Sequence, residues 1–174
     1  GGLTTQGTGT LTLSGTNTLS GAVNVSTGTI AVTSNNALGD TTNRTNISSG
    51  ATLDLQNVNY STTEQVNTSG TISTSTGTST LAGNVVLDGN STIDVDGTQL
   101  TLSGVVSGSN NLTKTGTGIA ILSGTNTYSG DTTISAGTFR VTGTLNNSTN
   151  VSVASGATYD VDATDTIGSI AGAG

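Results

Sequence analysis

The apolar residues of this chain fall in short pairs spaced two residues apart, and polar or glycine-rich stretches separate one pair from the next. Period-two spacing places both members of a pair on one side of an extended strand, so the pattern predicts strands and not helices. The separators are rich in Gly and Asn, which tolerate the positive φ angles of tight turns. The pairs are Leu11 and Leu13, Val23 and Val25, Ile30 and Val32, Leu53 and Leu55, Ile93 and Val95, Leu100 and Leu102, Ile119 and Ile121, Phe139 and Val141, Val151 and Val153, and Tyr159 and Val161.

Strands of this length cannot be stable alone, because each buries too little apolar surface to offset a backbone ordering cost of roughly 1–2 kcal/mol per residue. Parallel stacking of successive coils supplies the missing neighbours, with strands about 4.8 Å apart. We therefore predict an all-β fold, a right-handed parallel β-helix (β-solenoid). With turns of about 20–25 residues, the chain would make roughly seven or eight rungs in a rod on the order of 35 Å long.

One block of the sequence occurs twice. Residues 3–32 return as residues 112–141, with 17 of 30 positions identical and the identities concentrated in Gly, Thr, Ser and Asn. What recurs is therefore a scaffold of strands and turns. No charge-rich or proline-rich linker interrupts the chain, so we expect residues 1–174 to form a single continuous solenoid segment. Thr68–Thr80 is poor in apolar residues and is either a loop or a slightly irregular rung.

The similarity extends beyond this block but changes its spacing. SSGATLDL at Ser48–Leu55 corresponds to ASGATYDV at Ala154–Val161, with three residues fewer between the matching stretches of the second copy. The related blocks are thus 3–55 and 112–161. Length changes in solenoids usually fall in loops, so we predict a surface excursion in Thr33–Asn46.

The composition excludes several classes of protein. Hydrophobic residues make up 30% of the 174 residues and charged residues 7%, against nearly half and a quarter in ordinary globular domains, so a thick core cannot form. Without Cys or His there are no disulfides and no thiolate or imidazole metal sites. A net charge of −7 disfavours binding to nucleic acid or to an anionic membrane. The sequence has no Met and no signal sequence, so we expect a processed or internal segment of a longer protein. No apolar run reaches the roughly 20 residues of a membrane span, so we expect any anchor to lie elsewhere.

Four features of the second copy together resemble the autotransporter-associated β-strand repeat. They are the leading Lys114, the turn at Gly116–Gly118, the SGTNTYSG stretch at Ser123–Gly130, and the closing SAGT-aromatic-x-Val stretch at Ser135–Val141. The copies depart from this pattern at Leu19, where the second has Tyr128, and at Ala120, where a larger apolar residue is typical. The resemblance implies a passenger domain of a bacterial autotransporter, exported to the surface of a Gram-negative cell and anchored at its outer membrane.

Paired carboxylates raise the alternative of a glycan-cleaving β-helix enzyme, in which Asp residues act as acid and base. Asp94 and Asp96 share the outward face of one strand, with Ile93 and Val95 pointing inward, and Asp160 and Asp162 lie around Val161 in the same way. Such an enzyme also needs aromatic platforms and basic groups. The chain offers few aromatic and few basic residues, and Phe139 is expected in the core, so we predict no enzyme and no catalytic residue. The aromatic and basic residues are Tyr60, Tyr128, Tyr159, Phe139, Arg44, Lys114 and Arg140.

Two binding functions are alternatives to the structural one. Asp88, Asp94 and Asp96 are hard oxygen ligands that suit Ca²⁺, but their spacing fits neither an EF-hand nor a calcium-binding β-roll, so we predict no metal site and no cofactor. The chain has 39 threonines, and threonine ladders on flat solenoids can bind ice. That function needs one T-x-T per rung in register, whereas the apolar pairs do not keep a constant spacing.

The sequence thus favours a structural segment of a secreted bacterial surface protein. We expect an extracellular stalk or adhesin that forms a rigid rod and serves adhesion, biofilm or fibre formation. The expected partners are a second copy of the rod, or glycans and surface proteins of a host or matrix. Open solenoid ends carry unpaired strand edges that favour such self-association.

Overall fold

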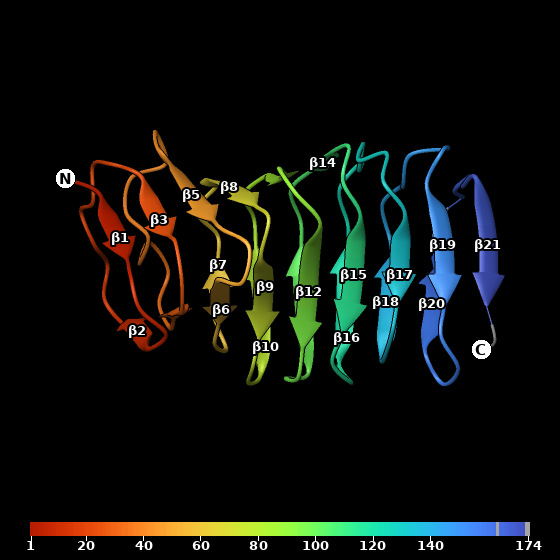
Figure 1. Ribbon diagram of the computed structural model, residues 1–174, viewed down its shortest axis with the longest axis horizontal. Helices are drawn as coiled ribbons and strands as arrows, with labels where there is room; N and C mark the ends of the chain where they lie inside the picture. Colours follow the sequence, from red (N-terminus) through yellow and green to blue (C-terminus); the bar gives the residue numbers. More distant parts are fainter. Residues whose placement is uncertain (163, 173–174) are drawn as a thin grey trace.

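The chain forms a parallel β-solenoid whose turns stack along one long axis, with the N-terminus at one end and the C-terminus at the other (Figure 1). The computed structural model describes residues 1–162 and 164–172, and the described residues contain strands and no helix. Each strand pairs in parallel with the equivalent strand one turn away. The predicted all-β solenoid is therefore confirmed, with about eight turns.

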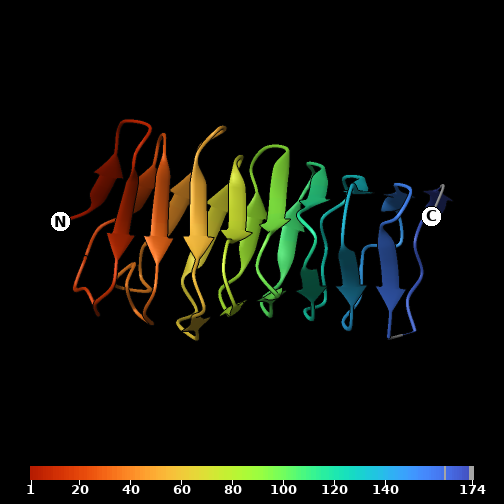
Figure 2. The same ribbon diagram turned by 90° about the horizontal axis from the view of Figure 1, so that it is seen from below.

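Three sheets run along the rod and form its faces (Figure 2). Sheet A contains β1 (Leu3–Thr5), β3 (Val23–Val25), β5 (Arg44–Ile47), β8 (Gln65–Thr68), β11 (Val85–Leu87) and β14 (Val106–Gly108). Sheet B contains β2 (Thr10–Leu13), β4 (Thr29–Val32), β6 (Thr52–Leu55), β9 (Thr71–Thr74), β12 (Ser91–Val95), β15 (Leu112–Thr115), β17 (Thr132–Ile134), β19 (Asn150–Val153) and β21 (Ser169–Gly172). Sheet C contains β7 (Asn59–Tyr60), β10 (Thr78–Leu81), β13 (Gln99–Leu102), β16 (Ile119–Leu122), β18 (Thr138–Val141) and β20 (Thr158–Val161).

The core consists of columns of apolar side chains that repeat once per turn inside the rod. Because paired strands keep their register, equivalent inward positions lie directly above one another. In sheet B one such column contains Ile30, Leu53, Ile72 and Ile93. In sheet C another contains Tyr60, Leu81, Leu102, Leu122 and Val141. All of these side chains are buried, so a thin core is sufficient to hold the solenoid together.

Strand β16 corrects one of the predicted pairs. We expected Ile119 and Ile121 to point inward, but the strand buries Ala120 and Leu122 and leaves the two isoleucines on the partly exposed outer face. Ala120 lies between Leu100 and Phe139 in the column. The large Phe139 side chain, which is fully buried as predicted, therefore has a small neighbour, and this explains the unusual alanine at this position.

The apolar-poor stretch Thr68–Thr80 is a regular turn and not a loop. It contributes the whole of β9 and most of β10, and Ser73, Thr74 and Ser79 are buried in it. Ser79 Oγ donates to the carbonyl oxygen of Leu55 at 2.9 Å, so a polar side chain can occupy an inward position when the backbone supplies its partner.

The two copies share glycines at the same positions because the backbones of stacked turns approach closely there. Gly28 has φ +69° and its counterpart Gly137 has φ +65°, which favour glycine. A Cβ atom at Gly28 would lie 2.4 Å from the carbonyl oxygen of Gly7, and one at Gly137 would lie 2.5 Å from that of Gly118. The corner thus requires glycine for two independent reasons.

The two copies of the repeat lie on different faces of the rod. The first copy begins with β1 in sheet A and β2 in sheet B, whereas the second begins with β15 in sheet B and β16 in sheet C. Five turns lead from β1 to β14 along sheet A, and β15 is the next strand. The repeat therefore recurs after five and a third turns and is rotated by one face.

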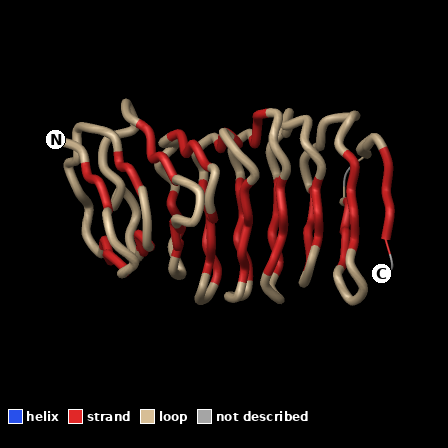
Figure 3. Tube along the Cα trace, viewed as in Figure 1, coloured by secondary structure: helices blue, strands red, loops and turns tan. Residues whose placement is uncertain are grey.

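The face that each copy leaves without strands is covered by two irregular segments. Residues 14–21 and 33–43 form the N-terminal wall, in the place where sheet C would otherwise begin, and residues 123–130 and 142–149 form the C-terminal wall, where sheet A has ended at β14. Figure 3 shows loop along the upper side of the rod beyond β14. In the first copy the irregular segments precede the start of sheet C, and in the second copy they follow the end of sheet A.

The length difference between the copies lies where it was predicted. Residues 33–43 connect β4 to β5, and residues 142–149 make the equivalent connection with three residues fewer. The longer segment is not a surface excursion, however, because Ala37 and Leu38 are buried and the Leu38 amide donates to the Tyr60 hydroxyl at 3.2 Å. It replaces the missing strand as a covering for the core.

We expect Leu122→Ala to lower the free energy of unfolding by about 2–4 kcal/mol, because it empties a fully buried position of the core. Ile121→Ala should cost less than about 1 kcal/mol, because the neighbouring side chain faces outward. Urea denaturation followed by circular dichroism measures both. An equal or larger loss at Ile121 would show that β16 has the opposite register.

Candidate functional surfaces

The first predicted carboxylate pair lies on the outside of the rod, as expected. Asp94 faces outward between the buried side chains of Ile93 and Val95, and Asp96 is exposed in the turn after β12. The Thr115 hydroxyl donates to Asp94 Oδ1 at 2.6 Å. This contact joins two neighbouring turns, so Asp94 contributes to the stacking of the solenoid.

The second carboxylate pair is bound to a basic residue. Arg140 Nε lies 3.4 Å from Asp160 Oδ2 and donates to Asp162 Oδ2 at 2.7 Å. The hydrogen bond and the charge of Asp162 raise the pKa of the guanidinium. All three groups lie on the surface, where ion pairs contribute little to stability. One guanidinium thus engages both carboxylates and balances the charge of one of them.

Asp88 lies just after β11 and contacts a row of asparagine side chains on sheet A. Asn46 Nδ2 donates to Asn24 Oδ1 at 2.8 Å, and Asn67 Nδ2 donates to Asp88 Oδ2 at 2.8 Å. The three asparagines occupy equivalent positions on β3, β5 and β8. Within residues 1–162 and 164–172, no group of three or more carboxylates is arranged to hold a metal ion.

A column of threonines runs along the outer face of sheet B, one on each of the first seven strands. The pairing register aligns Thr10, Thr29, Thr52, Thr71, Thr92, Thr113 and Thr133, and Ser152 and Ala171 continue the column. The variable spacing of the apolar pairs hid this column from sequence reasoning. Differences in turn length are absorbed in the corners and do not disturb the register, so our argument from spacing was wrong.

The adjacent outward column is mixed in character. It contains Thr12, Ala31, Asp54, Ser73, Asp94 and Thr115. Burial alone would raise the pKa of the Asp54 carboxyl, but hydrogen bonds from Ser75 and its neighbours outweigh that effect and lower it. An ionised carboxylate and an alanine interrupt any two-dimensional lattice of hydroxyls, so the threonine column alone does not favour ice binding.

Glu64 is a buried acid that sequence reasoning missed. Its side chain is 1% exposed. The Thr45 hydroxyl donates to Oε1 at 2.6 Å, and the Tyr60 hydroxyl donates to Oε2 at 3.4 Å. Burial raises the pKa of the carboxyl to about 7, and the nearby charge of Asp40 adds to this. The group therefore titrates near neutral pH inside the solenoid.

Lys114 is fully buried in the inward column of sheet B, between Ile93 and Ile134. Its Nζ donates to the carbonyl oxygens of Thr115 at 2.6 Å, Gly116 at 2.9 Å and Ala136 at 3.3 Å. Burial lowers the pKa of the ammonium. The side chain closes a corner and is no basic group for a ligand. Lys114 lies two residues after the buried Leu112 on the same strand, and this spacing could have predicted that its side chain points inward.

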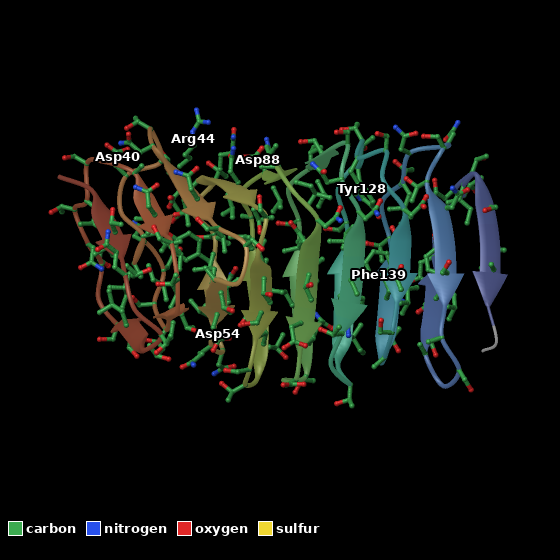
Figure 4. The ribbon with its side chains drawn as sticks, viewed as in Figure 1. Asp40, Arg44, Asp54, Asp88, Tyr128 and Phe139 are labelled. Atoms are coloured by element: carbon green, nitrogen blue, oxygen red, sulfur yellow. The ribbon has the colours of Figure 1, made fainter. Side chains whose placement is uncertain are left out.

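The aromatic residues also serve the core. Tyr60 and Tyr128 are buried, and the Tyr128 hydroxyl lies 2.6 Å from Thr132 Oγ1. Phe139 stacks on Tyr159 with ring centroids 6.3 Å apart. Figure 4 labels Tyr128 near the upper side of the rod and Phe139 at mid-height, and both are buried. These aromatic side chains are thus not platforms for sugars.

Comparison with known proteins identifies the repeat. The model of the passenger-associated-transport-repeat matches residues 3–32 and 112–141. The adhesin BmaC autotransporter of Brucella suis biovar 1 (strain 1330) is 33% identical over 147 residues, which cover 83% of this chain and 4% of that protein. No solved structure matches. The predicted resemblance is confirmed, and the chain carries two autotransporter passenger repeats.

These matches indicate where such a protein is found and which kind of protein it resembles. Passenger repeats belong to secreted, surface-exposed proteins, and both similarities are to passenger or adhesin sequences and not to enzymes. In the part of the chain that the structure describes, no helix is long and apolar enough to cross a membrane. The chain is therefore a passenger-type solenoid segment of a surface protein.

We expect the free energy of unfolding to fall by about 2–3 kcal/mol as the pH rises from about 4.5 to about 7. In this range the unfolded chain ionises Glu64, while the folded chain keeps the carboxyl protonated up to about pH 7. Glu64→Gln should remove this dependence and be more stable than the wild type at pH 8.

Urea denaturation at pH 5 and pH 8 measures this effect. Asp54→Asn is the matched control, because the lowered pKa of Asp54 places its titration below this range. The same pH dependence in Glu64→Gln as in the wild type would contradict the assignment.

Proposed function

We propose that this chain is a rigid segment of a cell-surface adhesin, in which it both spaces the parent protein away from the outer membrane and presents a side face for adhesion. The observation that carries the proposal is the unbroken sheet B, whose nine parallel strands run through both passenger repeats. A continuous ladder of backbone hydrogen bonds resists bending and transmits tension along the rod. The chain spans only 4% of its adhesin relative, so adhesion by the whole protein is part of the proposal.

The side faces support adhesion better than catalysis. They are polar, built from hydroxyl and amide groups, and their carboxylates are largely bonded to neighbouring residues. A long polar face can form many weak contacts, whose combined strength exceeds that of any single one. Glycans and surface proteins of a host or matrix are partners of this kind, and a second copy of the rod is the alternative.

We expect the purified chain to be a monodisperse rod of roughly 40 Å, from nine strands at about 4.8 Å each. Small-angle X-ray scattering and electron microscopy measure the shape over a concentration series. A flexible or expanded particle would contradict the spacer role.

The ends need a control, because the terminal turns expose Leu11 and Ile170. A Leu11→Lys, Ile170→Lys variant should suppress end-to-end contacts. Filaments that persist in this variant would favour lateral pairing of rods as the function.

Adhesion itself is measured with beads that carry the chain on layers of epithelial cells or of immobilised matrix. We expect retention above that of albumin-coated beads, increasing with the density of the chain. Retention equal to that of albumin, with the rod intact by scattering, would overturn the adhesive role and leave only the spacer.

A further inference from the structure

An open groove of about 480 Å³ crosses the C-terminal wall and continues onto residues 164–166 of the next turn. Its sides are formed by Thr125 and Thr127 on one turn, by Thr144 and Asn147 on the next, and by Thr164 and Thr166 on the last. The volume lies within the range of sites for small ligands. The groove exists because this face has no strand beyond β14, and irregular segments replace the flat sheet.

The floor of the groove is fixed by internal hydrogen bonds. Asn126 is 2% exposed, accepts from the Val106 amide at 3.0 Å and donates to the carbonyl oxygens of Gly124 and Thr144 at 2.9 Å. Asp165 accepts from the amides of Leu145 and Thr166, each at 3.0 Å and each with a different carboxylate oxygen. The floor is therefore preorganised, and its one carboxylate is already bonded.

The rim, in contrast, offers polar groups that the fold does not use. The side chains of Thr125, Thr127, Thr144 and Asn147 make no hydrogen bond to another described residue, and Thr125, Thr127 and Asn147 are exposed. Hydroxyls and amides can each donate and accept. Stacking of turns repeats them at about 4.8 Å, which suits a ligand with many hydroxyl groups in a row.

Charge narrows the class of ligand. The lining has no Lys or Arg, and the protein has a net charge of −7, so phosphate, sulfate and uronate groups are disfavoured. An extended peptide would need a free strand edge, but Asn126 already occupies the Val106 amide on β14. We propose that this groove binds an uncharged oligosaccharide, and this inference rests on the adhesive role proposed above and names its ligand.

The N-terminal wall shows that the repeat alone does not produce the groove. Its three additional residues bring Asn35 to the next turn, where Nδ2 donates to Ser61 Oγ at 2.9 Å and Oδ1 accepts from the Ser61 amide at 3.0 Å. The Thr62 hydroxyl also donates to Asn35 Oδ1, at 3.1 Å. Asn35 thus ties the longer segment of this wall to the next turn, and the first copy provides a comparison for the groove.

The experiment uses the ¹⁵N-labelled chain and four soluble probes, namely maltotriose, chitotriose, N-acetyllactosamine and the charged sialyllactose. We expect at least one uncharged probe to shift the amide signals of residues 125–127, 144–147 and 164–166, with a dissociation constant on the order of 1 mM. Sialyllactose should bind at least about tenfold more weakly than N-acetyllactosamine.

Matched variants assign the effect to the groove. Thr127→Val with Thr166→Val removes two rim hydroxyls and keeps their shape, and it should weaken binding about tenfold. Thr18→Val changes the equivalent of Thr127 in the first copy and should have no effect. Unshifted groove signals with all uncharged probes at about 10 mM, shifts only on other faces, or preferential binding of sialyllactose would each overturn the proposal.

The bead assay separates this inference from the adhesive role. If beads with the Thr127→Val, Thr166→Val variant adhere as well as the wild type, the groove is not the adhesive site, although the rod remains adhesive, and the deeper proposal is overturned. If wild-type beads do not adhere while the groove binds a sugar, the adhesive role fails and the oligosaccharide site is supported.

Discussion

Every other feature of this molecule depends on the parallel pairing of each strand with its equivalent one turn away. That pairing places like positions above like positions, so one inward residue per turn is enough to build a column of core. A chain with 30% hydrophobic residues can therefore bury a continuous interior. The same pairing requires glycine where two corners touch, as at Gly137.

Period-two patterning was sufficient to predict the fold, because inward residues alternate in almost every strand. It was insufficient at β16, where Ile119, Ala120, Ile121 and Leu122 are all apolar. The pattern there allows either the two isoleucines or the alanine and leucine to point inward. Alignment of the two copies resolves the choice, because Leu11 and Leu13 correspond to Ala120 and Leu122. The irregular walls were not predictable in this way, because their polar residues have no periodicity and only tertiary contacts show what they cover.

The candidate sites were harder to predict than the fold for a related reason. Outward columns such as the one through Thr52, Thr71 and Thr92 depend on register between turns of unequal length, which the linear sequence does not show. Glu64 and Lys114 are charged residues that the structure buries, whereas charged residue types are usually found at the surface. Each is accommodated only because a neighbouring turn supplies hydrogen-bond partners. The groove depends on a difference of three residues that looked like an ordinary loop change.

The rotation of the repeat by one face has a consequence for how such a rod meets a surface. Each copy carries its strand-free wall to a new direction around the rod axis, and at the same interval a fourth copy, about sixteen turns after the first, would bring the wall back to its first direction. In an array of this kind, successive irregular walls would face different directions around the rod axis. The rod could then engage a flat target without first turning about its own axis, and contact would not depend on the angle of approach.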